Sequence, residues 1–310
     1  MTAPRVESIA CANPMGIHRM AYYEWGDADN PDVLVCVHGL TRNGRDFDVL
    51  AERMQDKFRV ICPDIAGRGL SDWFTQPMSY NVAQYAADMV TLLGRLQPKR
   101  LSWVGTSMGG LIALTYAGLV AQAKLPPTRV APARMNVELA DSVVPISRLV
   151  LNDVGPRVES GSLMRIAQYL AEPTVFATFE QAVGYMRTTA ASFGPHSDEQ
   201  WALLTRHYFV QVNGQWVKHY DPAISAAFAS FNQDMVAKGE QLLWASYASS
   251  QVPTLILRGA QSDLLASSTV QQMCVLNSQA RAVEFAGVGH APSLVVEDQL
   301  DTVQRFLNEG

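Results

Sequence analysis

The segment LSWVGTSMGG at residues 101–110 constrains the fold most. It sets Ser107 between two glycines, at the point where a strand-like pattern ends and a helical pattern begins. A short apolar run precedes the glycines, and an apolar stretch with helical spacing, residues 111–120, follows them. A G-x-S-x-G on a strand-to-helix turn holds the serine hydroxyl out of the backbone, and Gly105 and Gly109 remove Cβ atoms where strand and helix crowd together. The unpaired N–H groups at the start of the helix favour negative charge nearby. We therefore interpret Ser107 as a nucleophile rather than as an incidental serine in a glycine-rich turn.

Short β-rich runs recur along the chain, each followed by a helical pattern. This alternation is typical of an α/β fold in which crossover helices connect the strands of a parallel sheet. The predicted strands are Arg19 to Trp25, Val33 to Val37, Arg59 to Cys62, Leu101 to Val104, Leu149 to Leu151, Thr254 to Leu257 and Ala282 to Phe285. Two apolar stripes with helical spacing should pack on the sheet: Tyr85, Met89, Leu92, Leu93 and Leu96, and then Leu300, Val303 and Leu307.

The stretch 155–248 differs from both flanks, because it lacks clear strand runs and is rich in alanine, methionine and aromatic residues. We expect a helical cap inserted into a core domain of residues 1–154 and 249–310, above the sheet edge where open α/β folds bind ligands. Residues 121–147, with four prolines, are expected to form an irregular surface excursion to which we assign no function. Five aromatic residues of the cap could line a pocket, but packing between helices is the favoured interpretation: Phe176, Tyr185, Phe193, Trp201 and Trp216.

Composition and charge exclude several classes of partner. The net charge is 24 − 29 = −5 and the basic residues form no runs, which argues against nucleic acid or an anionic membrane surface. The N-terminus has no apolar signal region and no segment is apolar enough to span a membrane, so we expect a cytoplasmic protein. The spacing of the cysteines and histidines supports no metal site and no cofactor. The four cysteines are expected to be reduced and structural: Cys11, Cys36, Cys62 and Cys274.

A serine hydroxyl is a poor nucleophile at neutral pH, so the chain must supply a base and a group that orients the base. His290 lies in a glycine-rich loop between an apolar run and the C-terminal helix, and Asp263 follows the strand that begins at Thr254. Ser107, Asp263 and His290 occur in the chain order that accompanies a serine on such a turn. Asp153 also follows a predicted strand and is the rival for the acid, but we interpret it mainly as a turn residue before Gly-Pro.

Acyl transfer also requires hydrogen-bond donors for the oxyanion. The sequence suggests the backbone N–H of Met108, directly after the nucleophile, and that of Leu40, on the loop after the strand Val33 to Val37. We expect His38 to be a structural anchor of this loop rather than a second base. Arg42 and Arg45 follow on the same loop and are candidates to bind a substrate carboxylate, although the ordinary solvated role is favoured for both.

These segments together resemble the α/β-hydrolase superfamily. The resemblance runs from about Arg19 to the C-terminus, through HGL at 38–40, PDIAGRGLSDW at 63–73, GTSMGG at 105–110, RGAQSD at 258–263 and GVGHAP at 286–291. It implies an eight-stranded, mostly parallel sheet flanked by helices, with a helical cap inserted after the sixth strand. It also implies Ser107 as nucleophile, His290 as general base, Asp263 as its orienter, and the Leu40 and Met108 amides as the oxyanion hole. A serine at position 107 disfavours the dehalogenases and epoxide hydrolases of the superfamily.

The leading interpretation is a carboxylesterase that cleaves esters of small or medium acyl substrates through an acyl-enzyme intermediate. A carbon–carbon bond hydrolase acting on vinylogous diketones is an alternative, although many such enzymes carry an aromatic residue after the catalytic histidine, where this chain has Ala291 and Pro292. A slow-turnover ligand receptor on the same fold ranks lower, because the triad and both glycines are complete. The sequence leaves the substrate and the oligomeric state open.

Overall fold

The computed structural model describes residues 3–123, 143–159, 161, 162, 165, 166, 170, 172–230 and 232–309. Its centre is an eight-stranded sheet with the order β1-β2-β4-β3-β5-β6-β10-β11, in which β2 alone runs antiparallel to its neighbours. The fold class predicted from the resemblance is therefore confirmed. The strands are β1 (Arg5–Asn13), β2 (Gly16–Trp25), β3 (Asp32–Val37), β4 (Arg59–Pro63), β5 (Arg100–Thr106), β6 (Ile146–Asn152), β10 (Thr254–Gly259) and β11 (Ala280–Phe285).

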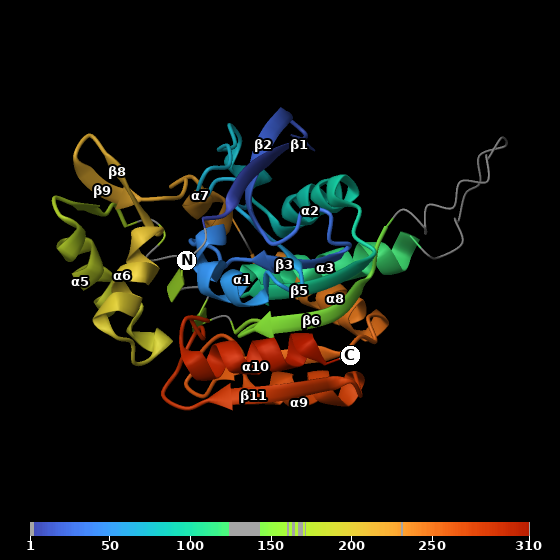
Figure 1. Ribbon diagram of the computed structural model, residues 1–310. Coiled ribbons are helices and arrows are strands. Elements are labelled where there is room, and N and C mark those ends of the chain that lie inside the picture. Colours follow the sequence, from blue (N-terminus) through green and yellow to red (C-terminus); the bar gives the residue numbers. More distant parts are fainter. Residues whose placement is uncertain are drawn as a thin grey trace.

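Helices cover both faces of this sheet (Figure 1). Alternate residues of the central strand β3 belong to two separate apolar cores, Val33, Val35 and Val37 to one and Leu34 and Cys36 to the other. This follows from the two-residue period of a strand whose two faces are both buried. Around the sheet lie α1 (Asp48–Met54), α2 (Val82–Leu96), α3 (Met108–Ala123), α8 (Gln233–Ser249), α9 (Ser267–Leu276) and α10 (Glu297–Asn308), with short 3₁₀ turns at Gly44–Phe47 and Pro77–Ser79.

The predicted strands and apolar stripes all fall on observed elements. Each of the seven predicted runs lies inside a strand of the large sheet, and the two stripes are the buried faces of α2 and α10. The strand that the sequence analysis missed is β1, which pairs with β2 as a hairpin at the sheet edge. Its side chains are mostly exposed, so it carries little of the apolar signal on which the other strands were recognised.

The interval between β6 and β10 corresponds to the expected cap, but it is not wholly helical. It contains a second sheet of order β7-β9-β8, and Figure 1 shows β8, β9, α5 and α6 beyond the arrowheads of β6 and β11. The expectation that this stretch lacks strands is therefore wrong. The elements are β7 (Val175–Phe176), α5 (Phe179–Thr189), a 3₁₀ turn (Ala191–Phe193), α6 (Asp198–Arg206), β8 (Phe209–Val212), β9 (Gln215–Lys218) and α7 (Ile224–Ala229).

Three further expectations concern residues 121–147, the cysteines and membrane-spanning helices. Most of the predicted excursion at 121–147 lies outside the described residues. All four cysteines are free, and three of them are buried. Among the described residues, no helix is both long enough and apolar enough to cross a membrane.

Candidate active site

Ser107 stands on a strained turn at the end of β5. Its φ of 51° lies in the left-handed region, which costs a residue other than glycine on the order of 1–3 kcal/mol. The turn is tied down because the Ser107 N–H donates to the Asn152 carbonyl of β6 at 2.9 Å, while the Ser107 carbonyl accepts from the N–H groups that begin α3. A Cβ atom on Gly109 would lie 2.0 Å from the Val37 carbonyl oxygen, so strand and helix can approach this closely only at a glycine.

His290, the residue predicted as the base, lies beside this serine. Its Nε2 lies 3.0 Å from the Ser107 Oγ, and its side chain is 14% exposed. The loop around it is fixed from two directions, because the Ser192 hydroxyl donates to the His290 carbonyl and the Asn152 amide donates to the Pro292 carbonyl. The predicted pairing of Ser107 with His290 is therefore present in the structure.

The acid beside His290 is Asp153, and the prediction that Asp263 would lie there is wrong. Asp153 Oδ2 is 2.7 Å from His290 Nδ1, and the carboxylate also accepts from the Gly259 N–H at 2.9 Å and the Ser262 hydroxyl at 2.6 Å. Its side chain is 0% exposed. Asp263, in contrast, is 50% exposed and forms a two-pronged ion pair with Arg165.

Both aspartates follow sheet strands, and the sequence favoured Asp263 because Asp153 was interpreted as a turn residue before Gly-Pro. The turn interpretation of Asp153 was correct for its backbone, since its φ is 54°. It was incomplete for its side chain, which reaches across β10 to groups more than a hundred residues away along the chain.

The two residues predicted to supply the oxyanion donors flank Ser107. Leu40 and Met108 both line the cavity that contains Ser107, and a Cβ on Gly39 would be 3.7 Å from the Ser107 Cβ. No hydrogen bond from the backbone N–H of Leu40 or Met108 is found within the described residues, which leaves both amides available to a ligand. His38 fixes this loop as expected: its Nε2 accepts from the Ile65 N–H and its Nδ1 lies 2.7 Å from the Gly39 carbonyl oxygen. Burial lowers the pKa of His38 to about 3, so the ring stays neutral.

A buried guanidinium that sequence reasoning missed stands behind these two amides. Arg68 is fully buried, and its Nε donates to the Leu40 carbonyl at 2.8 Å while its Nη2 lies 3.6 Å from the Met108 Sδ. Its Nη1 donates to the Ala66 carbonyl and the Tyr85 hydroxyl. Arg68 therefore fixes both halves of the predicted oxyanion hole relative to each other.

Arg42 and Arg45, the candidates for a substrate carboxylate, are each paired within the protein. Arg42 makes a two-pronged contact with Asp46 at 2.6 and 2.7 Å, and Arg45 makes one with Asp48. A further Arg42 donor goes to the Leu204 carbonyl at the end of α6. Since both charges are already neutralised, these arginines serve to hold the loop.

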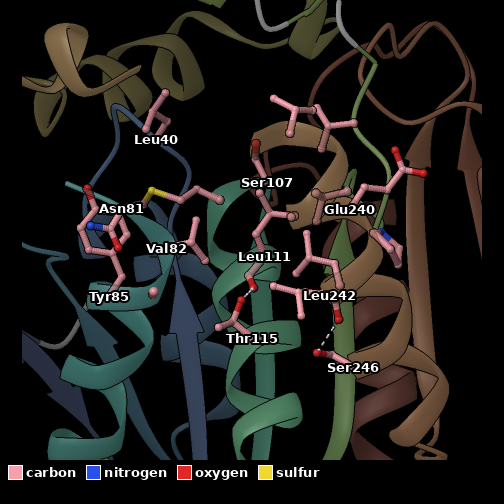
Figure 2. A pocket seen from close by; sticks show the side chains of 18 of the residues that line it. Leu40, Asn81, Val82, Tyr85, Ser107, Leu111, Thr115, Glu240, Leu242 and Ser246 are labelled. Atoms are coloured by element: carbon pink, nitrogen blue, oxygen red, sulfur yellow. Dashed lines mark hydrogen bonds between the residues drawn. The ribbon is translucent and has the colours of Figure 1, made fainter. Parts of the chain in front are cut away.

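A cavity of about 520 Å³ opens from Ser107 along α3. Figure 2 shows Leu111 and Thr115 following Ser107 along the helix, with Val82 and Tyr85 of α2 on one side and Leu242 and Ser246 of α8 on the other. The five cap aromatics named from the sequence do not line it, as the packing interpretation expected; Phe176 and Tyr185, for example, pack against each other at 5.4 Å between ring centroids. Among the described residues, the aromatic side chains that line it are Tyr80, Tyr85 and Phe228.

Within the described residues, one cluster of side chains that could ligate a metal ion lies among residues 11–88, apart from Ser107. Cys11, His18 and Asp88 offer ligand atoms that lie within 4.8 Å of one another. Both ring nitrogens of His18 already have partners, Asp88 at 3.1 Å and the Asn13 side chain at 3.1 Å. Burial raises the pKa of the Cys11 thiol to about 12, which disfavours the thiolate that a metal requires. This group therefore fits a hydrogen-bonded core cluster better than a metal centre.

The geometry at Ser107 agrees with comparisons to known proteins. The model of the alpha/beta hydrolase family matches residues 34–304. The chain belongs to the alpha/beta hydrolase family. This alpha/beta hydrolase is 42% identical to the 3-hydroxybutyrate-oligomer hydrolase of Cupriavidus necator over 308 residues, which cover 98% of each protein. It is also similar to the crystal structure of an alpha/beta hydrolase from Novosphingobium aromaticivorans, with 30% identity, 99% of each chain covered and a TM-score of 0.80. The protein is thus a hydrolase with hydrolase relatives along its full length.

Proposed function

We propose that this protein is a serine hydrolase that cleaves carboxylic esters through an acyl-enzyme intermediate. The observation that carries the proposal is the unbroken chain of contacts from the Ser107 Oγ through the His290 ring to the buried Asp153 carboxylate. An ester bond is the chemistry for which such a chain is suited, because the attacking hydroxyl must lose a proton and the leaving alkoxide must gain one.

In the first half of the reaction, the Ser107 Oγ attacks the ester carbonyl carbon and its proton passes to His290 Nε2. Asp153 holds the Nδ1–H of His290, which fixes the tautomer and stabilises the imidazolium that forms. The negative charge on the carbonyl oxygen is met by the N–H groups of Leu40 and Met108, each worth about 3 kcal/mol in the transition state by precedent. The carbon–oxygen bond then breaks, and His290 gives its proton to the departing alkoxide.

In the second half, a water molecule attacks the acyl-enzyme while His290 takes its proton. The acid product leaves and the Ser107 hydroxyl is restored, so the base returns to its starting state. Under this proposal, residues 1–154 and 249–310 form the catalytic core and residues 155–248 form the cap. Its elements from β7 to α6 lie beyond the carboxyl ends of the strands, whereas its last helix, α8, packs against α3 beside the sheet. The cap contributes Ile224, Phe228 and part of α8 to the cavity wall.

The substrate we propose is a short oligoester of a hydroxy acid. The support is the relative of Cupriavidus necator, whose name states that it hydrolyses 3-hydroxybutyrate oligomers and which matches this chain from end to end. The cavity agrees with such a substrate in size, since about 520 Å³ falls within the usual range for small-molecule sites. No observation favours the carbon–carbon bond hydrolase or the receptor over the esterase.

The test is the turnover of p-nitrophenyl butyrate and of the linear trimer of 3-hydroxybutyrate by wild type and Ser107→Ala. We expect the variant to fold normally and to lose about 10⁵–10⁶-fold in kcat on both substrates. Ser268→Ala is the matched control, because it makes the same change at an exposed position on α9. Turnover by Ser107→Ala at the level of Ser268→Ala would refute the serine mechanism. Turnover of the synthetic ester without the trimer would refute only the proposed substrate.

A further inference from the structure

The cavity wall beside Ser107 contains no positive charge within the part of the chain that the structure describes. The lining is apolar apart from a few neutral polar groups such as Thr115, Gln122 and Ser246. Among the described residues that line it, Glu240 is the one that carries a charge. Glu240 is itself occupied, because its Oε1 accepts from Arg157 at 2.7 Å and from the indole N–H of Trp244 at 3.3 Å. A carboxylate placed in this cavity would therefore meet no cation among the lining residues and would face the carboxylate of Glu240, whose nearby cation, Arg157, is already paired.

The arginines closest to the site along the sequence do not supply the missing charge. Arg42 and Arg45 are each held by an aspartate, and neither belongs to the cavity wall. Arg68 is fully buried behind Tyr85 and Met108, and its donors go to two carbonyl oxygens, a phenol and a thioether. None of the three presents a charge to a ligand inside the cavity.

The cavity lies on the side of Ser107 that suits the acyl part of an ester. The leaving oxygen must come close to His290, since this residue protonates it, and His290 is not part of the cavity wall. The wall instead follows α3 from Met108 to Gln122, which is about 21 Å at 1.5 Å per residue. An extended acyl chain on Ser107 can therefore lie along α3, while the alcohol part points towards His290.

From these observations, and resting on the proposed ester hydrolysis, we infer that the cavity binds an uncharged acyl chain and that any substrate carboxylate lies on the leaving-group side of the scissile bond. An oligomer of a hydroxy acid has a hydroxyl at one end and a carboxylate at the other. The inference fixes its direction: the hydroxyl-terminal part becomes the acyl group on Ser107, and the carboxylate-terminal part leaves as the alcohol.

The test compares two esters with six-carbon acyl chains at pH 7, p-nitrophenyl hexanoate and the mono-p-nitrophenyl ester of adipic acid. They differ in the far end of the chain, which is a methyl group in one and a carboxylate in the other. We expect kcat/KM to be at least about 100-fold lower for the adipate ester, because an unpaired carboxylate is costly to bury. Rates within threefold of each other would overturn the inference.

A lysine introduced into the wall should reverse this preference. We expect Thr115→Lys to raise the kcat/KM of the adipate ester relative to the hexanoate ester at least about tenfold, since it provides the missing partner. Thr91→Lys is the matched control: Thr91 lies on α2, is exposed, and makes the same hydroxyl-to-carbonyl contact four residues back as Thr115 does. Leu119→Lys repeats the test at a partly exposed wall position should Thr115→Lys fail to fold. An unchanged ratio in the folded lysine variants would overturn the placement of the acyl chain.

A third measurement separates this inference from the proposed function. Fluorophosphonates carrying a hexyl or a 5-carboxypentyl chain react with an activated serine, forming the oxygen–phosphorus bond and releasing fluoride with the serine proton. We expect the hexyl reagent to label Ser107 at least about 100-fold faster, as followed by intact mass. If no ester is turned over but this difference appears, the proposed function fails, while the preference of the cavity for an uncharged chain on Ser107 stands. Equal labelling rates, or no labelling by either reagent, would overturn the inference.

Discussion

Replacing Asp153 by asparagine should convert the Nε2 atom of His290 from a proton acceptor into a hydrogen-bond donor to Ser107. In the native site, Asp153 accepts from the Gly259 N–H at one oxygen and from Ser262 and His290 at the other. Asparagine has one oxygen and one NH₂ group, so it cannot satisfy both sets of donors. If the oxygen stays with the buried Gly259 N–H, the NH₂ faces His290 Nδ1, which must then accept the hydrogen bond. The ring proton moves to Nε2 and points at Ser107, where it blocks proton transfer.

The magnitude follows from the two orientations of the amide. Turning the amide around would leave the Gly259 N–H opposite a donor, at a cost of about 1–3 kcal/mol for a buried unpaired group. The orientation that traps the wrong tautomer is therefore preferred. We expect kcat to fall about 10⁴-fold, as the same substitution does in the serine-protease triad. We expect the free energy of unfolding to fall by about 1–3 kcal/mol, because the Asp153 carboxylate is fully buried.

The assay is steady-state hydrolysis of p-nitrophenyl butyrate, with urea unfolding measured on the same preparations. Asp263→Asn is the matched control, because Asp263 is half exposed and its pair with Arg165 should be worth no more than about 1 kcal/mol. We expect its kcat to stay within threefold of wild type. A larger loss in Asp263→Asn than in Asp153→Asn would refute the reasoning.

Three further predictions concern the surroundings of the triad. His38→Gln should flatten the pH dependence of the free energy of unfolding. In wild type, the unfolded chain binds a proton at His38 near pH 6.5, whereas the buried ring of the folded protein binds it only near pH 3. The stability that the neutral ring contributes is therefore present above pH 6.5 and is lost as the pH falls, by about 1.4 kcal/mol per pH unit. Urea unfolding from pH 4.5 to 7.5 measures the difference in slope, and parallel curves would contradict it. Arg68→Met should lower kcat about 10–100-fold with a smaller effect on KM, because the oxyanion donors lose their common support; an increase confined to KM would count against this role. Gly109→Ala should cost about 1–3 kcal/mol of stability, since its Cβ would lie 2.0 Å from a backbone oxygen, whereas Gly94→Ala on α2 meets nothing within 4 Å and should be neutral or stabilising in a thermal melt.

The contrast between Ser107 and Asp153 shows which parts of the site local sequence can reveal. Ser107 and His290 were predictable because the backbone around each carries its own requirement, a strained turn between glycines in one case and a glycine-rich loop after a strand in the other. The acid carries no such signature. Asp153 and Asp263 each follow a sheet strand, and only the tertiary packing of β6 against β10 decides which carboxylate reaches the ring.

The short sheet in the cap was missed for a different reason, because its signal was present in the sequence. Residues with strand propensity, Phe209, Val210 and Val212 before and Trp216 and Val217 after, flank Asn213-Gly214, and this dipeptide is a strong hairpin indicator. The structure has positive φ at both positions, 49° and 78°, as a tight turn between β8 and β9 requires. The compositional reading of the whole interval as helical masked this local pattern. Arg68 had no comparable signal, since nothing in the sequence states that an arginine will be fully buried.

The register between β5 and β6 has a consequence for heat inactivation. Thr106 pairs with Asn152, so Ser107 and Asp153 each come one residue after the same pair of hydrogen-bonded strand residues, near the middle of the sheet. Their separation is thus set by the spacing of two adjacent strands, about 4.8 Å, rather than by a loop. The position of the loop that carries His290 depends instead on contacts outside these two strands. Ser192 of the cap and Asn152 of the core hydrogen-bond to its backbone carbonyls. On warming, His290 should therefore lose its alignment with Ser107 before the two strands separate, and the proposed hydrolysis should stop at a temperature where the sheet is still intact.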